Sequence, residues 1–185
     1  MGYAMRLLRG EEFDADHRNS FMKSGLRIMM DLKFGDIPPQ VVHAATALCY
    51  RDNEHLFGFT VHCLGGPTML REACAAVNAT YHGNPEKKPF VIGVTLLTSL
   101  DEDDLRKLGI VGDRLEVVKR WTTIANDAGV PAIVSSPHET KVVLSVNQNL
   151  VVINPGIRFA GSDVGFQKRV DTPGAAIRNG ASYVV

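Results

Sequence analysis

Paired cysteines, net charge and long apolar runs are scarce in this sequence. The three cysteines, Cys49, Cys63 and Cys74, are an odd number without Cys-x-x-Cys spacing, so we expect no disulfides and a reducing, cytoplasmic environment. The 20 basic and 20 acidic residues give no net charge, so the chain lacks the net positive charge typical of proteins that bind nucleic acid or membrane surfaces. No apolar run approaches the length of a membrane span.

Signals for export, metal binding and repetition are also missing. Residues 1–10 contain Arg6 and Arg9 but lack the long apolar core of a signal peptide. His62 and Cys63 are adjacent and face opposite sides of a strand, which is not the spacing of a metal-ligand pair. Neither internal repeats nor low-complexity segments are visible. The chain is therefore expected to form a single domain over residues 1–185, with a sizeable core.

Short apolar strands alternate with helices along the chain. Turn residues bound the strand-like segments, and the segments between them show the apolar spacing of half-buried helices. The predicted strands cover residues 26–32, 56–62, 90–96, 132–135, 150–153 and 182–185. The predicted helices cover residues 38–49, 68–79, 101–108, 114–128, 138–146 and 172–179. This α/β order indicates a parallel sheet, and both an open doubly wound sheet and an incomplete (β/α)8 barrel fit it.

Charged residues follow the apolar start of the first predicted strand. Asp31 and Lys33 are two positions apart and therefore point to the same side of the strand, while Asp36 lies in the turn beyond it. In α/β folds, ligands bind at the carboxyl ends of the strands. The cluster thus indicates a functional site. The structural alternative is a surface ion pair, with Asp36 as the N-cap of a helix whose first turn holds Pro38.

Two further strand ends carry polar residues that packing does not require. His62 ends the second predicted strand, and a core histidine bonded to the backbone is the alternative to a chemical role. After the third strand, Ser99 and Glu102 match a capping box, so a helix start explains Ser99 without any ligand. Capping leaves Thr98 unexplained, which makes it a candidate site residue.

A polar loop containing glycine follows Asn154. It holds Arg158 and, further on, the run Gln167-Lys168-Arg169. Glycines let backbone amides approach an anion, and an arginine adds a fixed fork of donors. Such a loop suits phosphate, and a solvated surface loop is the alternative that remains open.

Taken together, these motifs resemble those of the orotidine 5′-phosphate decarboxylases. Residues 31–38, Asp-Leu-Lys-Phe-Gly-Asp-Ile-Pro, are similar to the family's Asp-x-Lys-x-x-Asp-Ile-Pro signature. Residues 60–66, 94–99, 155–158 and 167–169 resemble its later motifs in the same order. The first signature is shared with related sugar-phosphate decarboxylases and synthases. The Leu-Thr-Ser, Pro-Gly-Ile-Arg and Gln-Lys-Arg blocks are more specific to the orotidine enzymes.

The resemblance implies a (β/α)8 (TIM) barrel that converts orotidine 5′-monophosphate to uridine 5′-monophosphate and CO2 without a metal or organic cofactor. It implies a homodimer with shared active sites and no nucleic-acid or membrane partner. Lys33 would stabilise the charge left on the ring carbon and deliver the proton, and Asp31 would hold the ammonium and crowd the substrate carboxylate. Asp36 would reach into the partner subunit's site near the ribose.

The resemblance also implies four substrate-binding residues. Thr98 matches a residue near the pyrimidine, and Arg158 and Gln167 match the loop that grips the phosphate. Ile37 belongs to the signature itself and is the fourth predicted substrate-binding residue. Binding energy from the remote phosphate would be used to close the site and organise its charges.

Some positions depart from the family pattern. An Asp and a Lys of the family's first two strands would precede Met1, a Gly-Arg pair would follow Val185, and Pro39-Gln40 replace an Asn-Thr pair. We therefore expect a fragment, a barrel incomplete at both ends and itself poorly active or inactive. Two other functions stay open. One is a related metal-dependent sugar-phosphate decarboxylase or synthase, and the other is an inactive nucleotide-binding remnant.

Overall fold

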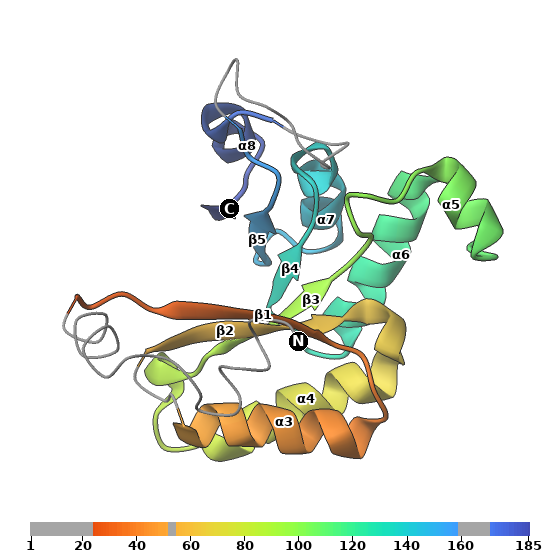
Figure 1. Ribbon diagram of the computed structural model, residues 1–185. Coiled ribbons are helices and arrows are strands. Elements are labelled where there is room, and N and C mark those ends of the chain that lie inside the picture. The colour runs from red at the N-terminus through yellow and green to blue at the C-terminus, as the bar shows by residue number, and fades with distance from the viewer. Residues whose placement is uncertain (1–23, 52–54, 159–170) are drawn as a thin grey trace, which may run out of the picture.

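The computed structural model describes residues 24–51, 55–158 and 171–185. Within them, six parallel strands form one sheet in which the spatial order follows the chain order. The strands are β1 (Ile28–Phe34), β2 (Leu56–His62), β3 (Phe90–Val94), β4 (Ala132–Val134), β5 (Val151–Asn154) and β6 (Tyr183–Val184). The sheet curls, so that β4 and β5 stand at a steep angle to β1 and β2 (Figure 1).

This strand order decides between the two folds that the sequence left open. A doubly wound sheet reverses its strand order at a switch point, whereas a (β/α)8 barrel adds each strand beside the preceding one. The unbroken order from β1 to β6 is that of a barrel, and the six described strands are an incomplete one. The expected fold class is therefore confirmed.

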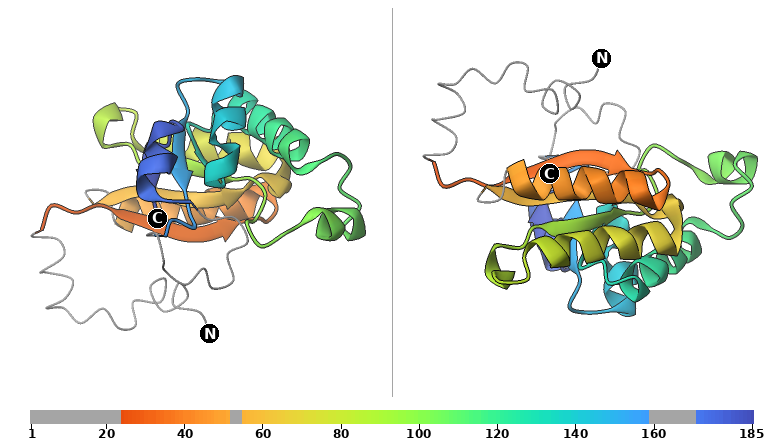
Figure 2. Two further views of the ribbon diagram at one scale, coloured as in Figure 1. Left: turned by 90° about the horizontal axis from the view of Figure 1, so that it is seen from above. Right: turned by 90° about the horizontal axis from the view of Figure 1, so that it is seen from below.

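Helices connect the strands and cover one face of the sheet. They are α3 (Pro38–Arg51), α4 (Gly66–Thr80), α5 (Glu102–Lys107), α6 (Arg114–Asp127), α7 (Thr140–Val146) and α8 (Pro173–Arg178). In the described part of the chain, three short 3-10 turns also lie in the connections: η1 (Cys63–Gly65), η2 (Pro85–Lys87) and η3 (Pro137–Glu139). Figure 2 shows α3 and α4 side by side across β1 and β2, while α5 projects beyond the sheet. None of the described helices has the length and apolar character needed to cross a membrane.

Two apolar clusters lie on opposite faces of the sheet. The larger one joins the sheet to the helices, and its fully buried side chains include Phe59, Val61, Met69, Leu70, Ile133 and Val152. The smaller one consists of strand residues, Phe57, Ile92, Ala132 and Ile153. The pairing of β1 with β2 is irregular between Leu56 and Gly58, and beyond that point the side chains of β2 alternate. Phe59 and Val61 pack toward the helices, so Thr60 and His62 face the other side of β2. The candidate site therefore lies on the face that the helices leave open.

The three cysteines are buried free thiols. Burial raises the pKa of Cys63 to about 12 and those of Cys49 and Cys74 to about 11. These groups stay protonated at neutral pH and are poor nucleophiles.

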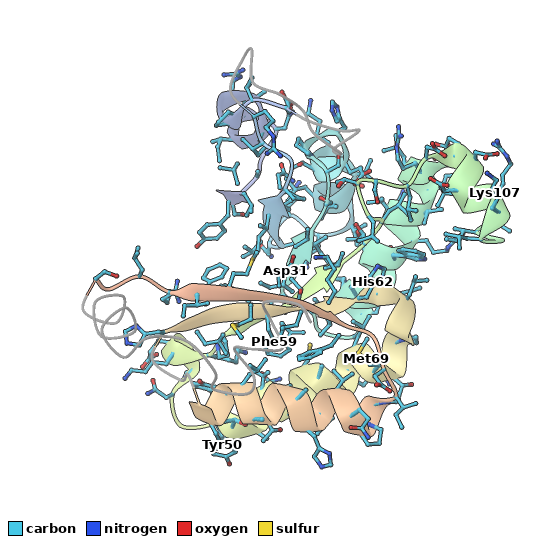
Figure 3. All side chains as sticks on the ribbon, viewed as in Figure 1. Asp31, Tyr50, Phe59, His62, Met69 and Lys107 are labelled. Carbon is cyan, nitrogen blue, oxygen red and sulfur yellow. The ribbon has the colours of Figure 1, made fainter. Side chains whose placement is uncertain are left out.

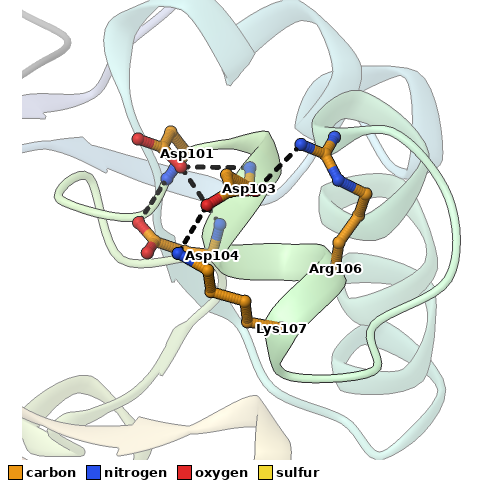
Figure 4. Close-up of polar contacts among 5 residues, drawn as sticks. All are labelled: Asp101, Asp103, Asp104, Arg106 and Lys107. Atoms are coloured by element: carbon orange, nitrogen blue, oxygen red, sulfur yellow. Dashed lines mark hydrogen bonds and ion pairs between the residues drawn. The ribbon is translucent and has the colours of Figure 1, made fainter.

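Two local expectations were wrong. Asp101, not Ser99, caps α5: its Oδ1 accepts the backbone N–H groups of Asp103 and Asp104, both at 3.1 Å, and Asp104 bonds back to the N–H of Asp101 (Figure 4). A carboxylate suits the positive end of a helix better than a hydroxyl does. The helix predicted over residues 138–146 is divided into η3 and α7, and Ser136 with Glu139 forms a capping box at η3.

Candidate active site

The centre of the site is a distortion in β1. Met30 pairs with Phe59 and Phe34 pairs with Val61, so residues 31–33 of β1 lie opposite the single residue Thr60 of β2. Bulges of this kind commonly lie at barrel rims, where they redirect side chains. Met30 and Phe34 pack against the helix-side apolar cluster on either side of the bulge, so Asp31 and Lys33 face the open side of the sheet.

Within the bulge, Lys33 has the left-handed backbone conformation, with φ of +48°. Its Nζ lies 2.5 Å from Asp31 Oδ2, and the two side chains are 40% and 52% exposed, respectively. Asp31 lies on the side of the sheet opposite α3 (Figure 3). The structure therefore brings Asp31 and Lys33 together as an accessible ion pair, as the sequence predicted.

A hydroxyl group supports this ion pair from beneath. Thr60 is fully buried, and its Oγ1 accepts the backbone N–H of Lys33 at 2.8 Å. The same hydroxyl donates to Asp31 Oδ1 at 2.9 Å. Thr60 is not among the predicted site residues, although it lies in a strand-end motif and faces the same side as the charges.

His62 lies one position further along the same face of β2. Its Nδ1 accepts the backbone N–H of Leu64 at 3.2 Å, which caps η1, and its ring meets Trp121 edge-on at 6.1 Å. Burial, and secondarily the positive charge of Lys33, lower the pKa of His62 below its ordinary value of 6.5. The backbone-bonded histidine that stood as the alternative to a chemical role is therefore what the structure contains.

The remaining candidate residues lie at neighbouring strand ends. Asp36 is exposed after β1, and its Oδ1 accepts the N–H of Ile37 at 2.7 Å. Ile37 is 62% exposed and immediately precedes α3, so Asp36 is not the N-cap that the alternative explanation required. Thr98 is half-buried in the connection from β3 to α5.

The candidate phosphate loop is described only in part. Arg158 is half-buried after β5, where its Nη1 donates to the Ile157 carbonyl at 2.8 Å and its N–H to the Asp171 carbonyl at 3.0 Å. Gln167 lies outside the described residues. The structure thus places Arg158 at the carboxyl end of the sheet, where β1 carries Asp31 and Lys33.

Fold and site define a class of protein: a (β/α)8-type barrel with charged groups at the carboxyl ends of its strands. A family model described as "Orotidine 5'-phosphate decarboxylase / HUMPS family" matches residues 2–185. The chain belongs to this family.

Relatives with known names agree with the family assignment. An orotidine 5′-phosphate decarboxylase from Moorella thermoacetica is 43% identical over 163 residues, which is 87% of this chain and 64% of the relative. One from Coxiella burnetii is 39% identical over 165 residues, 89% of this chain and 67% of the relative. The chain thus spans about two thirds of the length of these relatives.

Solved structures show the same fold. The crystal structure of an orotidine 5′-phosphate decarboxylase from Lactobacillus acidophilus matches with a TM-score of 0.73 at 30% identity. This match covers 93% of this chain and 71% of that protein. An uncharacterized conserved protein from Geobacillus kaustophilus also has a TM-score of 0.73, at 25% identity, with 94% and 72% covered.

Proposed function

We propose that this chain is an orotidine 5′-monophosphate decarboxylase, a carboxy-lyase that forms uridine 5′-monophosphate and CO2 in de novo pyrimidine biosynthesis. The observation that carries the proposal is the accessible Lys33–Asp31 ion pair at the bulged end of β1. The family match and the names of the relatives support it.

The chemistry requires a cation where negative charge develops. As the bond from the ring to the carboxyl carbon breaks, CO2 leaves and the electron pair stays on the ring carbon. The Lys33 ammonium stabilises that pair electrostatically and then transfers a proton to the same carbon. Asp31 pairs with the ammonium and holds it in place, and its own charge lies close to the substrate carboxylate.

The remaining residues bind substrate. Thr98 is proposed to contact the pyrimidine and Arg158 the phosphate, which their positions at the strand ends allow. Gln167 remains a prediction for the phosphate, and Ile37 lines the site beside Asp36.

We also propose a homodimer in which Asp36 completes the partner's site. Asp36 and Ile37 are both exposed just beyond β1, as residues that reach another subunit must be. A cytoplasmic location is proposed as well, supported by the three free thiols.

A turnover assay tests the proposed activity. Purified chain is mixed with orotidine 5′-monophosphate, loss of the orotate absorbance is followed, and the product is identified by chromatography. Lys33→Ala should abolish turnover and leave the circular dichroism spectrum unchanged. The matched control is Lys107→Ala, since Lys107 also pairs with an aspartate, Asp103 at 2.6 Å, but on the exposed face of α5. The control should keep its activity.

Three outcomes would count against the proposal. If the parent chain forms no uridine 5′-monophosphate, the inactive fragment or remnant expected from the sequence is favoured over an active decarboxylase. If Lys33→Ala retains a rate within about tenfold of the parent, about 1.4 kcal/mol of barrier, Lys33 is not the proton donor. Turnover that a chelator abolishes and added divalent metal restores would favour the metal-dependent sugar-phosphate enzymes instead.

A further inference from the structure

We propose that Thr60 is a positioning residue of the active site, whose hydroxyl sets the conformation of Lys33 and the orientation of Asp31. The inference rests on the proposed function of those two residues. It concerns a third side chain, on a neighbouring strand, that the signature does not contain.

The first argument comes from the backbone. Where three residues of β1 face one residue of β2, the regular ladder of backbone hydrogen bonds is interrupted. The N–H of Lys33 is bonded to the side chain of Thr60 at 2.8 Å. This bond links β2 to a residue with φ of +48°, a conformation that residues other than glycine rarely adopt. Thr60 therefore holds the backbone from which the Lys33 side chain starts.

The second argument comes from the direction of the hydroxyl proton. Thr60 Oγ1 has one proton, and because a lone pair takes the Lys33 N–H, that proton is free to point at Asp31 Oδ1, 2.9 Å away. Asp31 then uses Oδ1 for Thr60 and Oδ2 for the ammonium of Lys33. Two contacts on different oxygens fix the plane of the carboxylate. The three residues form a closed circuit of hydrogen bonds.

The third argument comes from burial. The side chains of Asp31 and Lys33 are 52% and 40% exposed, so packing alone does not restrain them. An exposed ion pair contributes little to stability, because holding two long side chains in one geometry costs side-chain entropy. Thr60 is 0% exposed and is fixed within β2. It is therefore the buried member of the circuit, against which the two exposed charged groups are oriented.

Thr60→Val tests this inference, because valine has nearly the shape of threonine without the hydroxyl. We expect kcat to fall about ten- to hundredfold, the loss typical of a hydrogen bond to a charged group, with KM little changed. Thr60→Ser keeps the hydroxyl and should retain most of kcat. If Thr60→Val does not fold, Thr60→Ala serves for the same comparison.

The matched control is Thr95→Val. Thr95 is also fully buried, but its hydroxyl donates to a backbone carbonyl, that of Val134 at 3.2 Å. This variant removes a buried threonine hydroxyl that does not bond to the ion pair. We expect this variant to lower the free energy of unfolding and to leave kcat unchanged.

A second measurement does not depend on activity. Hydrogen exchange followed by NMR measures the exchange rate of the Lys33 amide. This amide should exchange faster in Thr60→Val and stay protected in Thr60→Ser and Thr95→Val. If the parent chain shows no turnover, the proposed function fails and the amide exchange alone decides the role of Thr60. Unchanged kcat or unchanged Lys33 exchange in Thr60→Val would overturn the inference. An equal kcat loss in Thr60→Ser would also overturn it, because packing would then be the cause.

Discussion

Lys33 combines a positive charge with a backbone conformation that usually belongs to glycine. Its φ of +48° costs about 1–2 kcal/mol in an L-residue. The bond from its N–H to Thr60 and the ion pair with Asp31 offset part of that cost. Strained residues held by their surroundings often lie at functional sites, and here the strain accompanies the residue proposed to donate the proton.

His62 makes stability depend on pH. Since burial and Lys33 lower its pKa, the unfolded chain binds a proton more readily than the folded protein does. The contribution of neutral His62 to the free energy of unfolding is fully present above pH 6.5. It is lost as pH falls toward the lower pKa that His62 has in the folded protein. We therefore expect the free energy of unfolding to decline from about pH 7.5 to about pH 5, and His62→Asn to reduce that decline.

Urea unfolding across this pH range measures the effect. Asparagine can still accept the Leu64 N–H, so the cap of η1 is kept. His82→Asn is the control, because His82 is exposed after α4. If parent and His62→Asn lose stability equally on acidification, His62 is not responsible.

At the scale of an element, α5 depends on its cap. The helix has six residues, projects beyond the sheet and has one buried side chain, Leu105. Asp101 accepts two backbone N–H groups there. Asp101→Ala should lower the free energy of unfolding by about 0.5–2 kcal/mol, and Asp101→Asn by less.

The neighbouring Asp103 provides the contrast. Its ion pairs with Arg106 at 3.0 Å and Lys107 at 2.6 Å are exposed (Figure 4). Asp103→Ala should therefore cost less than Asp101→Ala in the same thermal or urea unfolding experiment. Equal losses would mean that the ion pairs, not the cap, stabilise α5.

At the scale of the whole molecule, the proposed dimer allows complementation. Lys33→Ala and Asp36→Ala chains should each be inactive, yet a mixed dimer has one site that combines Lys33 of one chain with Asp36 of the other. Random mixing of equal amounts should restore activity at about a quarter of all sites. The measurement is turnover after refolding the two chains together.

A double variant controls for this experiment. Lys33→Ala chains refolded with chains carrying both substitutions contain no Lys33 and should remain inactive. Mixed dimers that form, as shown by differently tagged chains, but recover no turnover would contradict the role of Asp36 across the interface.

Much of the molecule was predictable from local sequence. The bounds of β2, Leu56–His62, match the prediction, and α3, α4 and α6 lie within a few residues of theirs. Period-two alternation was enough to place Asp31 and Lys33 on one side, and the signature around them was enough to indicate the family. These features depend on residues that are close together in the chain, so the amino-acid sequence alone determines them.

The tertiary structure decided the rest. The choice of a barrel over a doubly wound sheet is a choice of strand order, which local patterns do not contain. β1 runs two residues later than predicted because its bulge is defined only by pairing with β2. Thr60 reaches Lys33 and Asp31 across 27 and 29 positions of sequence. Such contacts exist only once strand register is set, so sequence could name the charged residues but not the hydroxyl that orients them.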